Sequence, residues 1–280
     1  MQIAVVTNSL AGDGKGLKIS GQIINMLRGK GHEGQIFTEG FWDSDIHAFD
    51  QVWIVGGDGT LNYFVNQFHD LKKPICLFAG GTGNDFHAML YGDVSLSDQV
   101  ELALRSLPRP IDVGRCNDRY FLNGVGIGFE GSVVKHMAGK TKWPGKTSFL
   151  IAILKHILFY KEMSYSIRCM EKTADGDFLM IDVANGKRFG GGFYIAPRAE
   201  PNDGLFDVNL VSKLSPWRRV RYLPVIEKGN HLSFPFVDYF NARKIVISSS
   251  EIMQAHVDGE YVEGREFVIE MLAGKLEFLC

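Results

Sequence analysis

The chain has 280 residues, of which 45% are hydrophobic and 22% are charged, and its formal net charge is −2. This composition is typical of a globular protein with a substantial core, and the balanced charge argues against nucleic acid as a partner. Glycine is frequent, with 32 residues, and much of it lies in short loops, where the missing side chain lets backbone approach a ligand.

The first part of the chain alternates strand and helix patterns. Apolar runs predict strands, and apolar residues three and four positions apart predict helices. The predicted order is strand 3–7, helix 16–28, strand 35–38, strand 51–55, helix 61–68, strand 74–79 and helix 97–107. Ser97 is predicted to cap the last helix. The alternation indicates an α/β domain with a parallel sheet, spanning residues 1–110.

After Pro108 and Pro110 the pattern changes, and strand follows strand. The predicted strands are 111–117, 119–125, 164–169, 178–185, 192–196, 205–212, 244–249, 254–257, 267–272 and 275–279. Two helices are predicted, near 147–160 and 216–227. Alternating apolar and polar residues favour antiparallel pairing, so residues 111–280 are predicted to form a β-rich, mainly antiparallel domain.

The N-terminal sequence lacks the features of a signal peptide and is predicted to be the first strand. The longest apolar stretch, 149–160, is too short to span a bilayer. The four cysteines show no metal or redox spacing. The expected location is the cytoplasm, with transient contact to the inner face of the membrane left open.

Three glycine-bearing loops follow predicted strands. They are NSLAGDGKG (8–16), GGDGT (56–60) and GGTGND (80–85). Ligands of parallel α/β sheets bind beyond the carboxyl ends of the strands, and free N–H groups at helix N-termini favour anions. The three loops therefore predict a polyphosphate site. Each loop alone is also consistent with an ordinary tight turn, and the first lacks the P-loop pattern.

The spacing of GGDGT and GGTGND resembles the catalytic domain of the diacylglycerol kinase family. That family includes bacterial lipid kinases, sphingosine kinases and ceramide kinases, and it is distantly related to NAD kinases. The resemblance continues in order through IDVG (111–114), NGVGIGFEGSVV (123–134), GGGFYIAPRAEPNDGLFDV (190–208), GNH (229–231) and HVDGE (256–260). Two features depart from it. The first loop lacks the family's proline, and the chain stops at Cys280, so no return of the C-terminus to the first domain is predicted.

The resemblance implies transfer of the γ-phosphoryl group of ATP to a lipid hydroxyl. It implies that the nucleotide is held by Asn8, Thr38, Gly56, Gly57, Asp58, Gly59, Thr60, Thr82, Gly83 and Asn84. The candidate catalytic residues are Asp58, Asp258 and Glu260, and the position matching Glu260 is the family's proton acceptor. The choice of base among the three stays open, and Asp258-Gly259 is also typical of a hairpin turn.

A magnesium site is implied at the loop EPNDGLFD (200–207). Asp203 would bind Mg²⁺ with the carbonyls of Glu200 and Leu205, and Asp112 would extend the network through water. Mg²⁺ prefers such hard oxygen ligands and keeps several waters. A turn without metal is the alternative, and a metal here is either structural or catalytic.

The expected partners are a lipid alcohol and a peripheral membrane surface, and a homodimer is left open. The apolar segment 149–159 is a candidate acyl pocket, and the basic, tryptophan-bearing segments 135–146 and 217–221 are candidate headgroup contacts. Core packing and a solvated basic face are the alternatives. The alternative functions are an NAD kinase-like enzyme with a soluble substrate and a non-catalytic nucleotide-binding protein. The identity of the lipid is not predicted.

Overall fold

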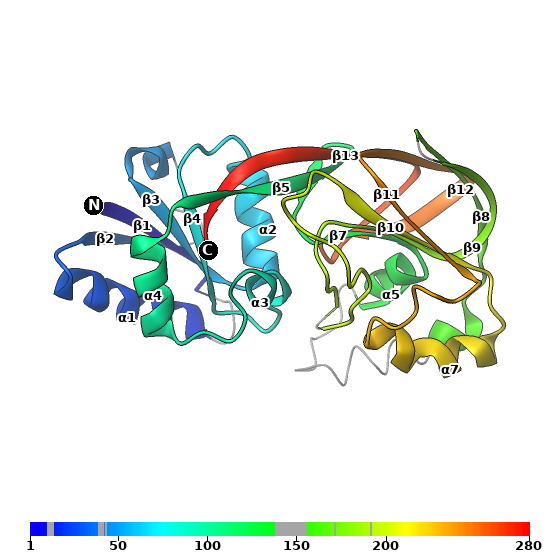
Figure 1. Ribbon diagram of the computed structural model, residues 1–280, viewed down its shortest axis with the longest axis horizontal. Helices are drawn as coiled ribbons and strands as arrows, with labels where there is room; N and C mark the ends of the chain where they lie inside the picture. Colours follow the sequence, from blue (N-terminus) through cyan, green and yellow to red (C-terminus); the bar gives the residue numbers. More distant parts are fainter. Residues whose placement is uncertain (10–13, 39–41, 43, 138–155, 171, 191) are drawn as a thin grey trace. The chain divides into compact units, whose positions relative to one another are not determined.

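The computed structural model describes residues 1–9, 14–38, 42, 44–137, 156–170, 172–190 and 192–280. The chain divides into two compact units, Met1–Asp112 together with Ala273–Cys280, and Val113–Leu272 (Figure 1). The last residues therefore return to the first unit, which corrects the prediction that residues 111–280 form one domain. The return has a packing reason, because Phe278 is fully buried and its ring lies 5.8 Å from that of Phe86.

The first unit is an α/β domain. Its own strands are β1 (Gln2–Thr7), β2 (Glu33–Thr38), β3 (Gln51–Gly56) and β4 (Ile75–Ala79). Its helices are α1 (Lys15–Gly29), the 3-10 helix Ser44–Ala48, α2 (Asp58–Gln67), α3 (Asp85–Tyr91) and α4 (Leu96–Arg105). The strand order is β13-β4-β3-β1-β2, where β13 contributes its C-terminal end, and these neighbours pair in parallel.

The sheet of the first unit is buried on both faces. Every residue of β3 from Val52 to Val55 is fully buried, as is typical of a strand in a parallel sheet. Trp53 and Val55 belong to one core with the apolar side chains of α1 and α4, while α2 packs on β3 and contacts α3. Helices and strands therefore bring the glycine loops to one edge of a rigid sheet.

Two helix starts differ from the prediction. Helix α4 is capped by Ser95, whose Oγ accepts the backbone N–H of Asp98 at 3.2 Å, so the assignment of Ser97 as the cap is wrong. Helix α2 begins at Asp58, three residues earlier than predicted, so this acidic residue lies in its first turn. Helix α3 was not predicted, because seven residues carry too short a periodic pattern.

The second unit is β-rich. Its strands are β5 (Pro108–Cys116), β6 (Arg119–Phe121), β7 (Gly124–Gly128), β8 (Met163–Cys169), β9 (Thr173–Ala184), β10 (Phe206–Ser212), β11 (Val237–Ala242), β12 (Lys244–Val257) and β13 (Glu260–Leu279). Its helices include α5 (Phe129–Met137) and α7 (Pro216–Glu227). Strand β5 begins in the first unit, and strand β13 ends in it.

The strands of this unit pair antiparallel in the order β11-β10-β9-β7-β12-β13. Strand β8 pairs with β9 and β12 beyond the ends of β7. Helix α5 packs closely on β12, because a Cβ atom at Gly131 would lie 2.3 Å from the backbone nitrogen of Ala255. This close approach places the first turn of α5 over β7 and β12.

Several predicted elements of the second unit are wrong in detail. Residues 192–196 form no strand and make only an isolated bridge between Phe189 and Phe193. Their apolar side chains pack into a loop core instead, which explains the misleading pattern. Residues 119–125 divide into β6 and β7, and the last two predicted strands are one continuous β13. Strand β11 and helix α5 were not predicted.

The predicted acyl segment lies outside the described residues up to position 155. In the part of the chain that the structure describes, no helix has the length and apolar character needed to cross a membrane.

Candidate functional site

The glycine loops after β3 and β4 lie directly against each other. A Cβ atom at Gly57 would lie 2.4 Å from the carbonyl oxygen of Gly83, and one at Gly81 would lie 2.5 Å from the Cα of Gly57. The backbone N–H of Asp58 donates to the carbonyl of Gly83 at 3.1 Å and closes this contact. The absence of side chains at positions 57 and 81 is therefore explained by loop packing rather than by room for a ligand.

Gly59 has no such packing reason. It is exposed, and a Cβ atom there would meet nothing within 4 Å. It lies in the first turn of α2, where backbone N–H groups have no intrahelical partner. Thr60 is buried instead, and its side chain packs over the bare Cα of Gly56, where a Cβ would lie 2.4 Å away. Among Gly56, Gly57, Gly59 and Gly81, Gly59 is the glycine whose missing side chain is not explained by loop packing.

The Asp58 side chain joins the two loops. Its carboxylate oxygens accept the backbone N–H groups of Asp85 at 2.9 Å and Phe86 at 3.0 Å, the first two residues of α3. These N–H groups would otherwise lack a helical partner. Asp58 therefore caps α3, a helix that the sequence did not predict, in addition to its candidate role in catalysis.

The loop after β4 is shaped by Asn84. Its side-chain amide donates to the carbonyl of Gly81 at 2.9 Å and accepts the N–H of the same residue at 3.2 Å. Thr82, between them, is exposed. A Cβ atom at Gly83 would approach only the carboxylate of Asp58, at 3.2 Å.

Asn8 and Thr38 lie at the same sheet edge as these loops. Thr7 pairs in register with both Thr38 and Val55, so the carboxyl ends of β1, β2 and β3 are level. Asn8 follows Thr7 directly, and its carbonyl oxygen would lie 3.1 Å from a Cβ at Gly16. The predicted nucleotide residues of the first unit thus lie along the same edge of the sheet. Residues 10–13 of the first loop lie outside the described residues.

Asp258 and Gly259 form the turn between β12 and β13. Both have positive φ angles, 47° and 87°, as a type I′ turn requires. The Asp258 carboxylate accepts three successive backbone N–H groups, those of residues 122–124, at 2.8, 2.9 and 2.9 Å. Asp258 therefore fixes the turn to the start of β7. Glu260, the next residue but one, has an exposed side chain.

Three polar residues behind this turn were not predicted. His256 and Asp182 are buried, and Nε2 of His256 lies 3.2 Å from Oε2 of Glu130, whose side chain is 18% exposed. Burial raises the pKa of Asp182 well above its usual value, and the charge of Glu130 raises it further. No local sequence motif marks these three residues, because each lies on a different strand or helix.

The predicted magnesium loop gathers carboxylates. Asp203 Oδ1 accepts the N–H of Leu205 at 2.9 Å. Asp207 is buried, and its Oδ1 receives no hydrogen bond from the described residues. Burial and then the charges of Asp203 and Glu200 raise the pKa of Asp207 to about 7. This crowding of hard oxygen atoms fits a divalent cation such as Mg²⁺, and Asp207 is a carboxylate of the loop that the sequence analysis did not name as a ligand.

Asp112 is the last residue of the first unit's N-terminal segment, and its Oδ1 accepts the N–H of Gly274 at 2.7 Å. This bond contributes to holding the returning end of β13, and the predicted link of Asp112 to the metal loop stays a prediction. Among the described residues, no group of three or more His, Cys, Asp or Glu side chains is arranged as a metal site. A metal at residues 200–205 would therefore depend on backbone carbonyls and water as well.

Two family models match the chain. The diacylglycerol kinase catalytic domain matches residues 2–116, and the YegS C-terminal NAD kinase beta sandwich-like domain matches residues 123–280. The second model alone covers more than half of the chain. The boundary between the two matches falls within the connection from the first unit to the second.

Curated and solved proteins agree with these models. The chain is 28% identical over 229 residues to a diacylglycerol kinase of Bacillus subtilis, covering 78% of this chain and 74% of that protein. A solved diacylglycerol kinase of Bacillus anthracis has a TM-score of 0.73 at 20% identity, covering 99% of this chain and 96% of that one. An NAD kinase of Archaeoglobus fulgidus in complex with ATP has a TM-score of 0.57 at 17% identity, covering 100% and 94%. The fold is thus that of diacylglycerol kinases and NAD kinases, and the chain belongs to the diacylglycerol kinase family, as a lipid kinase with a YegS-type C-terminal domain.

Proposed function

We propose that the protein transfers the γ-phosphoryl group of ATP to the hydroxyl group of a diacylglycerol-like or sphingoid lipid. The observation that carries the proposal is the joined pair of glycine loops, with the exposed Gly59 at the first turn of α2. Free N–H groups at such a helix start favour phosphate. The relative from Bacillus subtilis is named a diacylglycerol kinase, and the NAD kinase neighbour was solved with ATP.

The nucleotide phosphates would bind along the backbone of residues 56–60 and 82–84, with Asn8 and Thr38 at the same sheet edge. The negative charge of Asp58 beside a phosphate requires a cation, and the Mg²⁺ that accompanies ATP would provide it. Asp58 would then orient the phosphates by holding both loops and by binding this ion, directly or through water.

Glu260 is the proposed base. The alcohol oxygen attacks the γ-phosphorus, the bond from that phosphorus to the β–γ bridging oxygen breaks, and ADP leaves. The alcohol proton passes to the Glu260 carboxylate, directly or through one water. Support comes from the neighbouring Asp258, whose carboxylate already accepts three backbone N–H groups, whereas the Glu260 side chain is exposed.

The loop 200–207 is the proposed site of a second Mg²⁺. Asp203 and the carbonyls of Glu200 and Leu205 would hold it, with Asp207 as a further oxygen donor and Asp112 extending the network through water. The ion would neutralise the crowded carboxylates and order the loop. It is proposed here as a structural ion.

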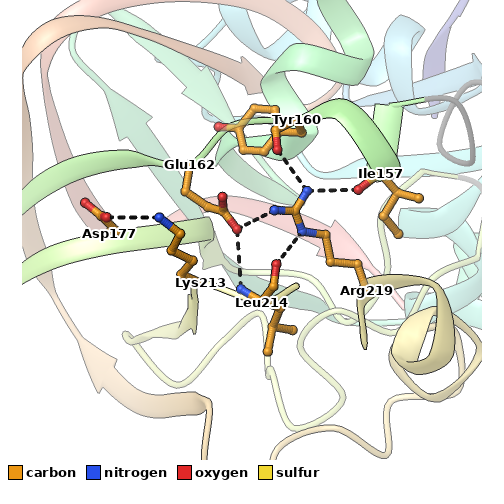
Figure 2. A network of polar contacts seen from close by, with 7 residues as sticks. All are labelled: Ile157, Tyr160, Glu162, Asp177, Lys213, Leu214 and Arg219. Carbon is orange, nitrogen blue, oxygen red and sulfur yellow. Dashed lines mark hydrogen bonds and ion pairs between the residues drawn. The ribbon is translucent and has the colours of Figure 1, made fainter. Parts of the chain in front are cut away.

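A membrane surface is the proposed place of access to the lipid. Trp217 and Phe159 are 80% and 83% exposed. They protrude from two segments that Arg219 ties together, because its Nη1 donates to the carbonyls of Ile157 and Tyr160, each at 2.9 Å (Figure 2). Aromatic side chains of this kind insert at the boundary between headgroups and acyl chains.

The basic residues beside Trp217 differ in exposure and therefore in role. Arg218 and Arg221 are exposed and suit anionic headgroups, each contributing about 1 kcal/mol near the surface. Arg219 is buried and pairs with Glu162 at 2.5 Å, so it does not belong to a basic surface (Figure 2). The basic segment 135–146 lies outside the described residues from position 138 onward.

Labelled ATP, presented with a panel of diacylglycerols, sphingoid bases, ceramide and NAD, tests the proposed function. Each lipid is offered with and without anionic vesicles. Transfer of label to a lipid, increased by anionic vesicles, is the expected result. Transfer to NAD alone would instead support the soluble-substrate kinase, and binding of ATP without any transfer would support the non-catalytic alternative.

The variant Glu260→Gln, measured in the same assay, tests whether Glu260 is the base. Its kcat is expected to fall at least about 100-fold with little change in the KM for ATP. Glu263→Gln is the matched control, since Glu263 is an exposed carboxylate on the same strand. A loss of ATP affinity without a loss of kcat would assign Glu260 to nucleotide binding. Sedimentation of the purified chain tests whether it forms a homodimer, which the sequence leaves open.

A further inference from the structure

Four strands of the second unit carry a transverse row of residues. Asn209 of β10 pairs with Asp182 of β9, Asp182 pairs with Gly126 of β7, and Gly126 pairs with His256 of β12. Directly paired residues point to the same face of a sheet. The row is therefore polar at three of its four positions, and those three residues are buried. A polar row at this depth requires internal partners.

The glycine in this row leaves room for a fourth side chain. A Cβ atom at Gly126 would lie 2.1 Å from Oε2 of Glu130 and 2.5 Å from Nε2 of His256. Glu130, in the first turn of α5, thus reaches over position 126 and contacts His256 at 3.2 Å. The result is a hydrogen-bonded pair of ionisable groups, Glu130 and His256, next to the turn formed by Asp258 and Gly259.

The hydrogen bonds determine where the protons lie. The backbone N–H of Gly259 donates to Nδ1 of His256 at 3.2 Å, so Nδ1 carries no proton. The imidazole proton is therefore on Nε2, from which it is donated to Glu130. A protonated Nδ1 would face the N–H of Gly259 as donor against donor and would break this bond.

The contact with His256 keeps Glu130 ionised. Burial alone would raise the pKa of Glu130, but its hydrogen bond and charge interaction with His256, and then Asp182, outweigh burial and lower the pKa. Burial and then the charge of Glu130 raise the pKa of Asp182 well above its usual value, and neither of its carboxyl oxygens has a hydrogen-bond partner among the described residues. The Glu130 carboxylate thus accepts the Nε2 proton and holds one imidazole tautomer.

The turn next to His256 is formed by Asp258 and Gly259, and the proposed base, Glu260, follows it directly. Asp258 is bound to the start of β7 through its carboxylate, and its N–H donates to the carbonyl of Gly124 at 2.9 Å. Gly259 is held by His256 alone among the side-chain contacts of the described residues. Glu260 follows directly, so its direction depends on the peptide plane that His256 fixes.

We propose that Glu130 and His256 are positioning residues: Glu130 selects one tautomer of His256, and His256 holds the N–H of Gly259 and thereby orients the Glu260 carboxylate. This inference rests on the proposed role of Glu260 as the base. Neither residue is required to touch the substrate. Their effect is exerted through the backbone of the turn.

A pair of substitutions at His256 separates the two hydrogen bonds. In His256→Asn the side-chain oxygen lies near the former Nδ1 and retains an acceptor for Gly259. In His256→Gln the amide nitrogen lies near the former Nε2 and retains the donor to Glu130, while the acceptor for Gly259 is lost. We expect His256→Gln to lower kcat at least about tenfold with an unchanged KM for ATP, because small misplacements of a reacting group are costly. His256→Asn is expected to retain several times the kcat of His256→Gln.

His231→Gln is the matched control. His231 is also buried in the second unit, and its Nε2 donates to the carbonyl of Ile195 at 3.0 Å, far from the turn in the sequence. It is expected to change stability but not kcat. A His256→Gln enzyme with wild-type kcat, or one that is more active than His256→Asn, would overturn the proposal.

A second measurement needs neither a variant nor activity. Long-range ¹⁵N–¹H correlation spectra of the full chain labelled at histidine report the tautomer of His256 at neutral pH. A proton on Nε2 and a bare Nδ1 support the proposal, and a proton on Nδ1 would overturn it. If the wild-type chain transfers phosphate to no lipid, the proposed function fails, and the spectrum still decides whether the hydrogen-bonded pair of Glu130 and His256 exists.

Discussion

The carboxylate of Asp58 accepts the backbone N–H of Asp85 at 2.9 Å, and this bond joins loops that lie 27 positions apart in the sequence. Asp58, which lies at the candidate nucleotide site, is therefore also the N-terminal cap of helix α3. It has both a structural role and a proposed catalytic role, and the variant Asp58→Asn distinguishes the two.

Replacing Asp58 with Asn is expected to lower kcat at least about 100-fold, because the charge that would bind the metal of the nucleotide is removed. One of the two hydrogen bonds to α3 is also lost, which is expected to destabilise the protein by about 1–2 kcal/mol. Phosphoryl transfer and urea unfolding measure the two effects. Asp98→Asn, at the start of α4, is the control for a loss of charge at a helix start. Wild-type turnover in Asp58→Asn would show that Asp58 acts only as a cap.

Alanine at Gly59 and alanine at Gly57 are expected to behave in opposite ways. Gly59→Ala introduces a methyl group into open space within a helix, so stability is expected to stay equal or to rise by up to about 1 kcal/mol. Its KM for ATP is expected to rise severalfold, since the methyl group crowds the backbone proposed to bind phosphate. Thermal unfolding and the ATP dependence of the rate measure this.

Gly57→Ala is expected to destabilise the first unit, because the new methyl group would lie 2.4 Å from the carbonyl of Gly83. The activity of Gly57→Ala is expected to fall in proportion to the fraction of the protein that is no longer folded. Equal ATP kinetics for Gly59→Ala and the wild type would remove the argument that this glycine serves the nucleotide.

Arg219→Met is expected to destabilise the protein by about 3–5 kcal/mol, because it leaves Glu162 as a buried, uncompensated charge. Both side chains are only 4% exposed, and the guanidinium also donates to the carbonyls of Leu214, Ile157 and Tyr160 (Figure 2). Denaturant unfolding gives the free energy. The exposed Arg221→Ala is the control and is expected to change stability by less than about 0.5 kcal/mol. Similar losses for the two variants would contradict a buried ion pair.

The stability of the protein is expected to depend on His231 below pH 6.5. Burial lowers the pKa of His231, so the unfolded chain binds a proton more readily than the folded chain does. The contribution of neutral His231 is therefore present above about pH 6.5 and is lost as the pH falls toward the lowered pKa. Urea unfolding at pH 7.5, 6.5 and 5.5 should show a smaller loss for His231→Gln than for the wild type, with exposed His47→Gln resembling the wild type. Parallel pH curves for His231→Gln and the wild type would contradict this assignment.

Local patterns in the sequence predicted much of the first unit. The apolar runs of β1, β3 and β4 and the helical spacing of α1 are confirmed within one or two residues. Helix α7 begins and ends where its pattern predicted. The glycine loops and their family resemblance led to the lipid kinase family, which the two family models confirm.

Tertiary structure decided what local patterns could not. The sequence by itself determined the order of strands and helices and the motifs that identify the family, because periodicity and turn chemistry depend on neighbouring residues. Only the folded chain placed Phe278 beside β4, Asp58 at the start of α3, and Glu130 in contact with His256. Each of these relationships joins positions far apart in the chain. Burial and hydrogen bonding between such positions arise from packing, and no local pattern of residue types encodes them.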